Sequence, residues 1–175
     1  MADVGSRYTT TLARSQFTAR FVLRGELTAA RALSAVFGVA LPEKINSANA
    51  DAARAALMLG PDEWLLLASD AGADVLATAL GQALAGIAAA LVDVTHRQTG
   101  VDLAGEAVTT TLNAAVPLDL SARAFPVGMA TRTIFDKSEI VLWRTGPLAF
   151  HIEVWRSFAP YVEGLLAVFQ GEPLG

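Results

Sequence analysis

The expected fold depends on residues 54–68, which read RAALMLGPDEWLLLA. Two short apolar runs, Arg54–Leu59 and Glu63–Ala68, flank the turn sequence Gly60-Pro61-Asp62. Proline presets the first central dihedral of a turn, and aspartate tolerates the second. The stretch therefore predicts a β-hairpin of two apolar strands.

The segments around this hairpin complete an α+β pattern. Residues 16–24 alternate between apolar and polar side chains, as a half-buried strand does, and the apolar residues after Gly25 follow helical spacing. The predicted elements are a strand at Gln16–Arg24, a helix at Leu27–Phe37, a loop at Pro42–Ala50, a helix at about Ala73–Leu84 and a strand at Ala88–Val94. With the hairpin they give the ferredoxin-like order β-α-β-β-α-β.

The second half of the chain repeats part of this order. The predicted elements are a strand at Gln98–Leu103, a helix at Gly105–Ala115, an irregular crossing at Pro117–Pro126, strands at Met129–Phe135, Glu139–Arg144 and Leu148–Val154, and a helix from about Ser157 to Phe169. We therefore expect an α+β fold of two ferredoxin-like βαββαβ-type halves, 15–95 and 96–170. No long linker separates the halves, so residues 1–175 are expected to form a single compact body.

The composition excludes several classes of protein. Apolar residues make up 53% of the 175 and charged residues 17%, which excludes intrinsic disorder. The absence of cysteine excludes disulfides and Cys-based metal sites, and two histidines are too few for a His-rich one, so no metal is expected. A net charge of −4 disfavours binding to nucleic acid. Residues 1–7 lack the apolar stretch of a signal peptide, so a cytoplasmic location is expected.

One uncharged stretch, Val75–Val92, approaches the length of a transmembrane helix. It contains Gly81 and Gly86 and is bounded closely by Asp74 and Asp93. We therefore interpret it as a helix, a break and a buried strand, and expect no membrane contact.

Few residues suggest catalysis, because no nucleophile elbow, phosphate-binding loop or HExxH motif is present. The segment Asp93–Arg97 follows a predicted strand and is one candidate site. The alternative, which we favour, is that Asp93 and Thr95 fix a turn. No catalytic residue is assigned.

A second candidate is the strand that carries His151, Glu153 and Trp155 on one face. An acid beside an imidazole could perform acid–base work, and the alternative is an outward polar face. The pairs Trp143-Arg144 and Trp155-Arg156 are candidates for a protein interface, since Trp and Arg are frequent anchors there. A role in the core, or in filling a groove, is the alternative for these tryptophans.

Several segments together resemble a known family. They are Leu59–Leu66, Val92–Arg97, Pro117–Leu120 with Ala124–Pro126, Thr131–Thr133, Leu142–Arg144 and Val154–Phe158. In this order, from about residue 55 to the C-terminus, they resemble the gamma subunit of heterotetrameric sarcosine oxidase. That family is related to the folate-binding domain of the glycine-cleavage T protein.

The resemblance implies an accessory, non-catalytic subunit whose isolated chain is inactive. The complex oxidatively demethylates sarcosine to glycine and transfers the one-carbon unit to tetrahydrofolate. The resemblance implies alpha, beta and delta subunits as partners, which hold FAD, FMN, NAD and tetrahydrofolate, and no cofactor on this chain. Isolated, the chain could self-associate.

One position departs from the T-protein pattern. The T-protein relatives carry a pterin-contacting glutamate after a Thr-Gly turn, and the matching stretch Thr145–His151 ends in a histidine. A neutral imidazole offers one acceptor, where a pterin presents paired N–H donors. This departure disfavours folate binding by this chain and suits a subunit that has kept the fold without the site. The alternative function is a free-standing folate-binding one-carbon-transfer protein that uses Glu153 and the Asp93–Arg97 segment. His151, Glu153 and Asp93 are the candidate cofactor-binding residues.

Overall fold

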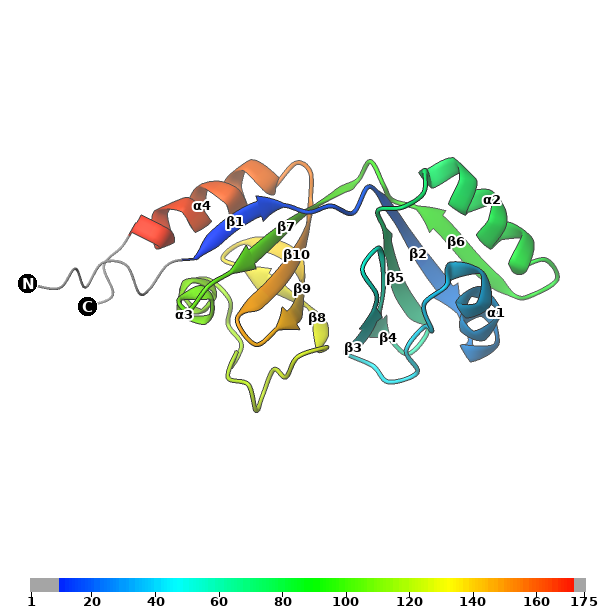
Figure 1. Cartoon of the computed structure of the whole chain (residues 1–175), viewed down its shortest axis with the longest axis horizontal. Coiled ribbons are helices and arrows are strands. Elements are labelled where there is room, and N and C mark those ends of the chain that lie inside the picture. The colour runs from blue at the N-terminus through cyan, green and yellow to red at the C-terminus, as the bar shows by residue number, and fades with distance from the viewer. Residues whose placement is uncertain (1–9, 172–175) are drawn as a thin grey trace, which may run out of the picture. The chain divides into compact units, whose positions relative to one another are not determined.

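The computed structural model describes residues 10–171, which fold into two compact units (Figure 1). The N-terminal unit comprises Gln16–Gln98 and Gly128–Thr131. The C-terminal unit comprises residues 10–15, Thr99–Val127 and 132–171. Each contains helices and one five-stranded sheet, which confirms the predicted α+β class. The single compact body expected from the sequence stays a prediction.

The N-terminal unit has the predicted β-α-β-β-α-β order with one additional strand. Its elements are β2 (Ala19–Gly25), α1 (Leu27–Phe37), β3 (Ser47–Ala50), β4 (Arg54–Gly60), β5 (Glu63–Ala68), α2 (Ala73–Ala83) and β6 (Ala89–Asp93). The strands lie in the order β3-β4-β5-β2-β6, and β2 pairs antiparallel with both β5 and β6. Residues of α1 and α2 join those of β2, β4 and β5 in one hydrophobic core.

The hairpin of β4 and β5 forms as predicted, with Leu57 opposite Leu65 and Met58 opposite Trp64. Every residue of β5 is buried. The indole N–H of Trp64 donates a hydrogen bond of 2.7 Å to the carbonyl of Pro42, which fixes the connection after α1 against the core. The hairpin therefore contributes two strands to the sheet and a buried tryptophan that holds the connection after α1.

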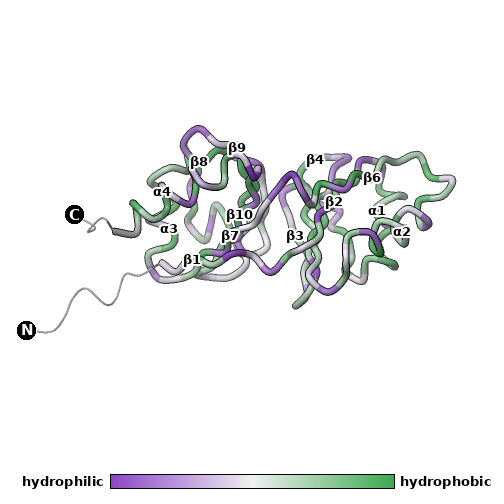
Figure 2. Tube along the Cα trace, turned by 90° about the horizontal axis from the view of Figure 1, so that it is seen from above, coloured by the Kyte–Doolittle hydropathy of each residue, from purple (hydrophilic) through white to green (hydrophobic). Residues whose placement is uncertain are grey.

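The uncharged stretch Val75–Val92 divides into α2 and β6, as predicted, and both are largely hydrophobic in Figure 2. The expected burial of the strand is wrong, because β6 lies at the edge of the sheet and Val92 is 51% exposed. Gly86 between them has a φ of 78°, a left-handed conformation that favours glycine. No helix within residues 10–171 is long and apolar enough to cross a membrane.

One predicted loop is a strand. Ser47–Ala50 forms β3, pairing antiparallel with β4 although its sequence, Ser-Ala-Asn-Ala, has no β-branched or large apolar side chain. Backbone hydrogen bonds hold it, including one of 2.7 Å from the N–H of Ala48 to the carbonyl of Gly128. The prediction was wrong here because an edge strand can be specified by its neighbours' backbone rather than by its own side chains.

The C-terminal unit has the same plan with a different chain order. Its elements are β1 (Thr11–Arg14), β7 (Gln98–Ala104), α3 (Val108–Asn113), β8 (Ala130–Phe135), β9 (Ser138–Gly146), β10 (Ala149–Trp155) and α4 (Ala159–Gly171). Its sheet order, β1-β7-β10-β9-β8, matches β6-β2-β5-β4-β3 of the N-terminal unit position by position. The edge position that β6 fills in one unit is filled in the other by β1, from the start of the chain.

Three predictions for this unit need correction. No element was predicted at residues 11–14, where β1 pairs with β7. Helix α3 is shorter than the predicted Gly105–Ala115, because Gly105 has a φ of 134°, which is outside the helical region, and the helix begins only at Val108. Helix α4 begins at Ala159, two residues after the predicted start at Ser157; it buries Val162 and Leu166, whereas Tyr161 and the preceding Phe158 are exposed.

Candidate functional site

The candidate site lies on one face of the C-terminal sheet. His151 and Glu153 are two residues apart on β10, so their side chains share that face. Trp143 lies opposite His151 in the antiparallel register of β9 and β10. Gly100 and Asp102 are two residues apart on the neighbouring β7. Three adjacent strands thus bring these five residues together.

The His151 imidazole lies between two carboxylates. Its Nδ1 is 2.6 Å from Oδ1 of Asp102, and its Nε2 is 2.9 Å from Oε1 of Glu153. His151 and Glu153 are 0% and 1% exposed, whereas the Asp102 side chain is 44% exposed. The array therefore runs from a buried carboxylate to one at the surface.

The surroundings determine the charge of this imidazole. Burial has the largest single effect and lowers the pKa of His151, because it disfavours the charged form. The hydrogen bonds and negative charges of Asp102 and Glu153 act in the opposite direction and together raise the pKa to about 9. At neutral pH His151 is therefore an imidazolium that donates a hydrogen bond from each nitrogen.

Two further residues enclose the imidazolium. A Cβ on Gly100 would lie 2.8 Å from Cε1 of His151, 2.7 Å from Oε1 of Glu153 and 2.6 Å from Cβ of Ser15, so only glycine fits there. The Trp143 ring packs edge-on against the imidazole, with centroids 5.9 Å apart and planes at 66°. Its indole N–H is buried and has no hydrogen-bond partner within the described residues.

This arrangement does not provide a general base at neutral pH. Both nitrogens of the imidazolium already carry protons that are hydrogen-bonded to carboxylates, so neither can take up another. Within residues 10–171, no group of three or more His, Cys, Asp or Glu side chains could hold a metal ion. The array is suited to holding a buried charge rather than to transferring a proton.

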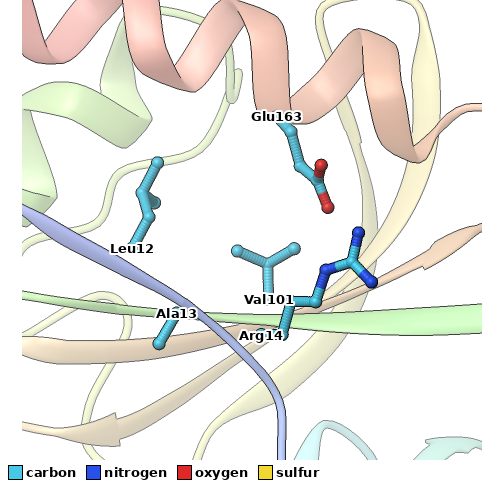
Figure 3. Close-up of a pocket in the computed structure, with 5 residues that line it drawn as sticks. All are labelled: Leu12, Ala13, Arg14, Val101 and Glu163. Atoms are coloured by element: carbon cyan, nitrogen blue, oxygen red, sulfur yellow. The ribbon is translucent and has the colours of Figure 1, made fainter.

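A pocket of about 210 Å³ lies among β1, β7 and α4 (Figure 3). Val101 lines it, and because side chains alternate along β7, the pocket is on the opposite face of the sheet from Gly100 and Asp102. Figure 3 shows Glu163 of α4 and Arg14 of β1 pointing toward one another across it. It is separate from the His151 array.

Residues 24–169 match the model of the sarcosine oxidase, gamma subunit family. The chain belongs to this family. The sarcosine oxidase gamma subunit of Corynebacterium sp. strain U-96 is 33% identical over 165 residues, which cover 91% of this chain and 78% of that one. The gamma subunit from an Arthrobacter species is 34% identical over 122 residues, covering 69% of this chain and 59% of its relative.

Solved structures agree with this family assignment. A chain of the heterotetrameric sarcosine oxidase from Corynebacterium sp. U-96, in complex with pyrrole 2-carboxylate, has a TM-score of 0.86 and 29% identity, covering 99% of this chain and 91% of its own. The glycine cleavage aminomethyltransferase T from Bartonella henselae has a TM-score of 0.70 at 15% identity, covering 92% of this chain and 46% of its own. The second likeness shows a shared fold, as predicted.

The structure of this gamma-subunit family member places the three predicted cofactor residues in different units. His151 and Glu153 meet in the C-terminal unit, whereas Asp93 is exposed in the N-terminal unit. The Asp93 carboxylate accepts a 2.8 Å hydrogen bond from the N–H of Thr95, whose hydroxyl accepts one from the N–H of Arg20. This geometry favours the turn interpretation of Asp93–Arg97.

Sequence reasoning missed Asp102 and Gly100. A charge at Asp102 within the otherwise apolar run Val101–Leu103 was the available signal, because a charge on a central strand needs a partner. The partner could not be named without knowing that β10 lies beside β7.

The predicted interface residues have contrasting environments. Trp155 is 44% exposed and Arg156 is exposed, whereas Trp143 and Arg144 are mostly buried. The Arg144 guanidinium lies over the Phe150 ring and donates to four carbonyls, those of Leu120, Phe125, Gly146 and Pro147. It therefore ties the irregular crossing to the β9–β10 turn, and its predicted interface role stays a prediction.

Proposed function

We propose that this chain is the accessory, non-catalytic gamma subunit of a heterotetrameric sarcosine oxidase. The likeness to a chain of that enzyme over 99% of the present one, at a TM-score of 0.86, carries the proposal. The occupied nitrogens of His151 support a non-catalytic role, since the strongest acid–base candidate among the described residues is already fully hydrogen-bonded.

In this proposal the chemistry belongs to the partners. The assembled enzyme oxidatively demethylates sarcosine to glycine and passes the one-carbon unit to tetrahydrofolate. The alpha, beta and delta subunits hold FAD, FMN, NAD and tetrahydrofolate, and the present chain stabilises their assembly. The cytoplasmic location expected from the sequence stays a prediction.

The surface that we propose for partner contact begins at Trp155 and continues along α4. Phe158, Tyr161 and Val168 are 48%, 39% and 54% exposed, and they recur with Leu165 at helical spacing on one side of the helix. The neighbouring side of α4 is buried through Val162 and Leu166. A helix that is apolar on its solvent side as well as its core side favours coverage by another protein.

The proposal is tested by co-expressing the chain with alpha, beta and delta subunits from its own source. We expect one complex by size measurement, which oxidises sarcosine, while the isolated chain is colourless and inert. The double variant Phe158→Ser/Val168→Ser should weaken assembly without unfolding the chain. Val75→Ser is the matched control, because Val75 is 69% exposed on α2 of the other unit.

Two results would contradict the proposal. One is the absence of any complex with the three subunits. The other is micromolar binding of tetrahydrofolate by the lone chain that is lost in Glu153→Ala, which would favour the free-standing folate-binding protein.

A further inference from the structure

The two carboxylates beside His151 are placed as a receptor for a flat ring. We propose that Asp102 and Glu153, enclosed by Gly100 and Trp143, form a binding site for a small planar cation with two N–H donors, and that the side chain of His151 fills this site. The His151 side chain thus acts as the ligand of this site. When the imidazole is removed by mutation, an added small molecule with a similar planar, cationic ring can bind in its place.

The first argument is the placement of the acceptors. Oδ1 of Asp102 and Oε1 of Glu153 lie 2.6 Å and 2.9 Å from the two nitrogens at either side of one ring. These carboxylates come from different strands, β7 and β10, whose backbones fix the positions of the two Cα atoms. Burial of Glu153 further restricts its side chain, so the inner acceptor is positioned by the surrounding structure and not by the imidazole alone.

The second argument is the shape of the enclosure. Gly100 leaves room for the ring by lacking a Cβ, which would lie 2.8 Å from the imidazole carbon Cε1. The Trp143 ring closes another side at a centroid distance of 5.9 Å. Together they leave space for a flat ring of this size, while the 44% exposed Asp102 side chain provides a route of entry from solvent.

The third argument is electrostatic. Glu153 is 1% exposed and lies at the inner end of the array. When a buried carboxylate loses a cationic neighbour, less of its desolvation cost is offset. The site should therefore attract a replacement cation strongly when the His151 ring is absent.

The experiment uses the full chain with His151→Gly and 4-methylimidazole, which reproduces the missing side chain. We expect the melting temperature of the variant to rise by about 2–4 °C when the ligand is present at about five times its dissociation constant. Imidazole with His151→Ala is the second arm, because that variant keeps Cβ and needs a ligand without the methyl group.

Three controls separate a specific site from general effects. The unaltered chain should show no such rise, since its own imidazolium fills the site. Thiazole has a similar ring without an N–H donor and should not rescue the variant. His151→Gly/Glu153→Gln should lose at least tenfold in affinity for 4-methylimidazole, because the buried negative charge is removed.

Equal responses to 4-methylimidazole and thiazole, or equal responses of the variant and the unaltered chain, would overturn the proposal. If His151→Gly does not fold without ligand, the readout becomes ligand-dependent refolding monitored by tryptophan fluorescence. In that case refolding with 4-methylimidazole and not with thiazole supports the site, and no refolding with either contradicts it. These outcomes do not depend on assembly with other subunits.

Discussion

Nε2 of His151 lies 2.9 Å from Oε1 of Glu153, two residues further along the same strand and almost completely buried. Neighbours on one face of a strand are normally spaced too widely for short side chains to meet, but these two are long enough to form a hydrogen bond. The second nitrogen reaches Asp102 on the next strand. His151 therefore contacts both Glu153, which is close in the sequence, and Asp102, which is far away in it.

The stability of the chain should fall as the pH rises from about 6.5 to 9. The folded-state pKa of His151, about 9, is above its unfolded value, so the folded chain binds more protons in this window. The stabilisation is full below the unfolded pKa of about 6.5 and is lost toward pH 9, by at most about 3 kcal/mol. Urea unfolding from pH 6 to 9 measures it. His151→Gln should give a flatter profile, and equal slopes for both chains would contradict the prediction.

Gly100→Ala should destabilise the C-terminal unit by about 1–3 kcal/mol, the usual cost of overpacking a dense interior. Its new Cβ would lie under 3.0 Å from Ser15, His151 and Glu153 atoms. Gly81→Ala is the matched control, because Gly81 lies in α2 and a Cβ added there would have nothing within 4 Å. That change should stabilise by about 0.5–1 kcal/mol, and similar melting temperatures for both variants would refute the steric argument.

Arg144→Met should destabilise the chain by about 3 kcal/mol, because buried carbonyls lose a charged donor that they cannot replace with water. Arg144→Lys should recover only part of this, since one ammonium cannot reach four carbonyls in the geometry of a planar guanidinium. Thermal unfolding measures both. Arg156→Met, at an exposed arginine, should change stability by under about 0.5 kcal/mol. A loss as large as that of Arg144→Met would contradict this assignment.

Trp64→Phe should cost about 1–3 kcal/mol, because it leaves the carbonyl of Pro42 without its 2.7 Å indole donor in a buried position. The same substitution at the 44% exposed Trp155 should cost much less. Chemical denaturation of the two variants provides the comparison. If both lost the same stability, the hydrogen bond from Trp64 would not be the cause.

The sequence predicted those elements whose information is local. The hairpin at Arg54–Ala68 combines a proline turn with two apolar runs, and it formed as expected. Helix α2 and strand β6 were separable because Gly86 interrupts the uncharged stretch. By contrast, β1 and β3 are four-residue edge strands with weak patterns of their own, and their pairing depends on the backbones beside them.

The candidate site, too, was predictable only in the part that depends on local sequence. The placement of His151 and Glu153 on one face followed from strand periodicity. Burial of that face did not follow, and the choice between an acid–base pair and an outward polar face stayed open. The structure corrects the outward interpretation, because both side chains are buried.

The sequence by itself determined the α+β class, the repeated element order and the family of this chain, because turns, periodicity and ordered motifs are local properties. The tertiary structure alone decided that β1 completes the C-terminal sheet, that β7 lies beside β10, and that Asp102 therefore meets His151. Those facts depend on contacts between residues far apart in the chain, about 49 positions for Asp102 and His151, and side-chain pattern along one strand does not specify its neighbour. The raised pKa of His151 depends on this contact together with that of Glu153 on its own strand.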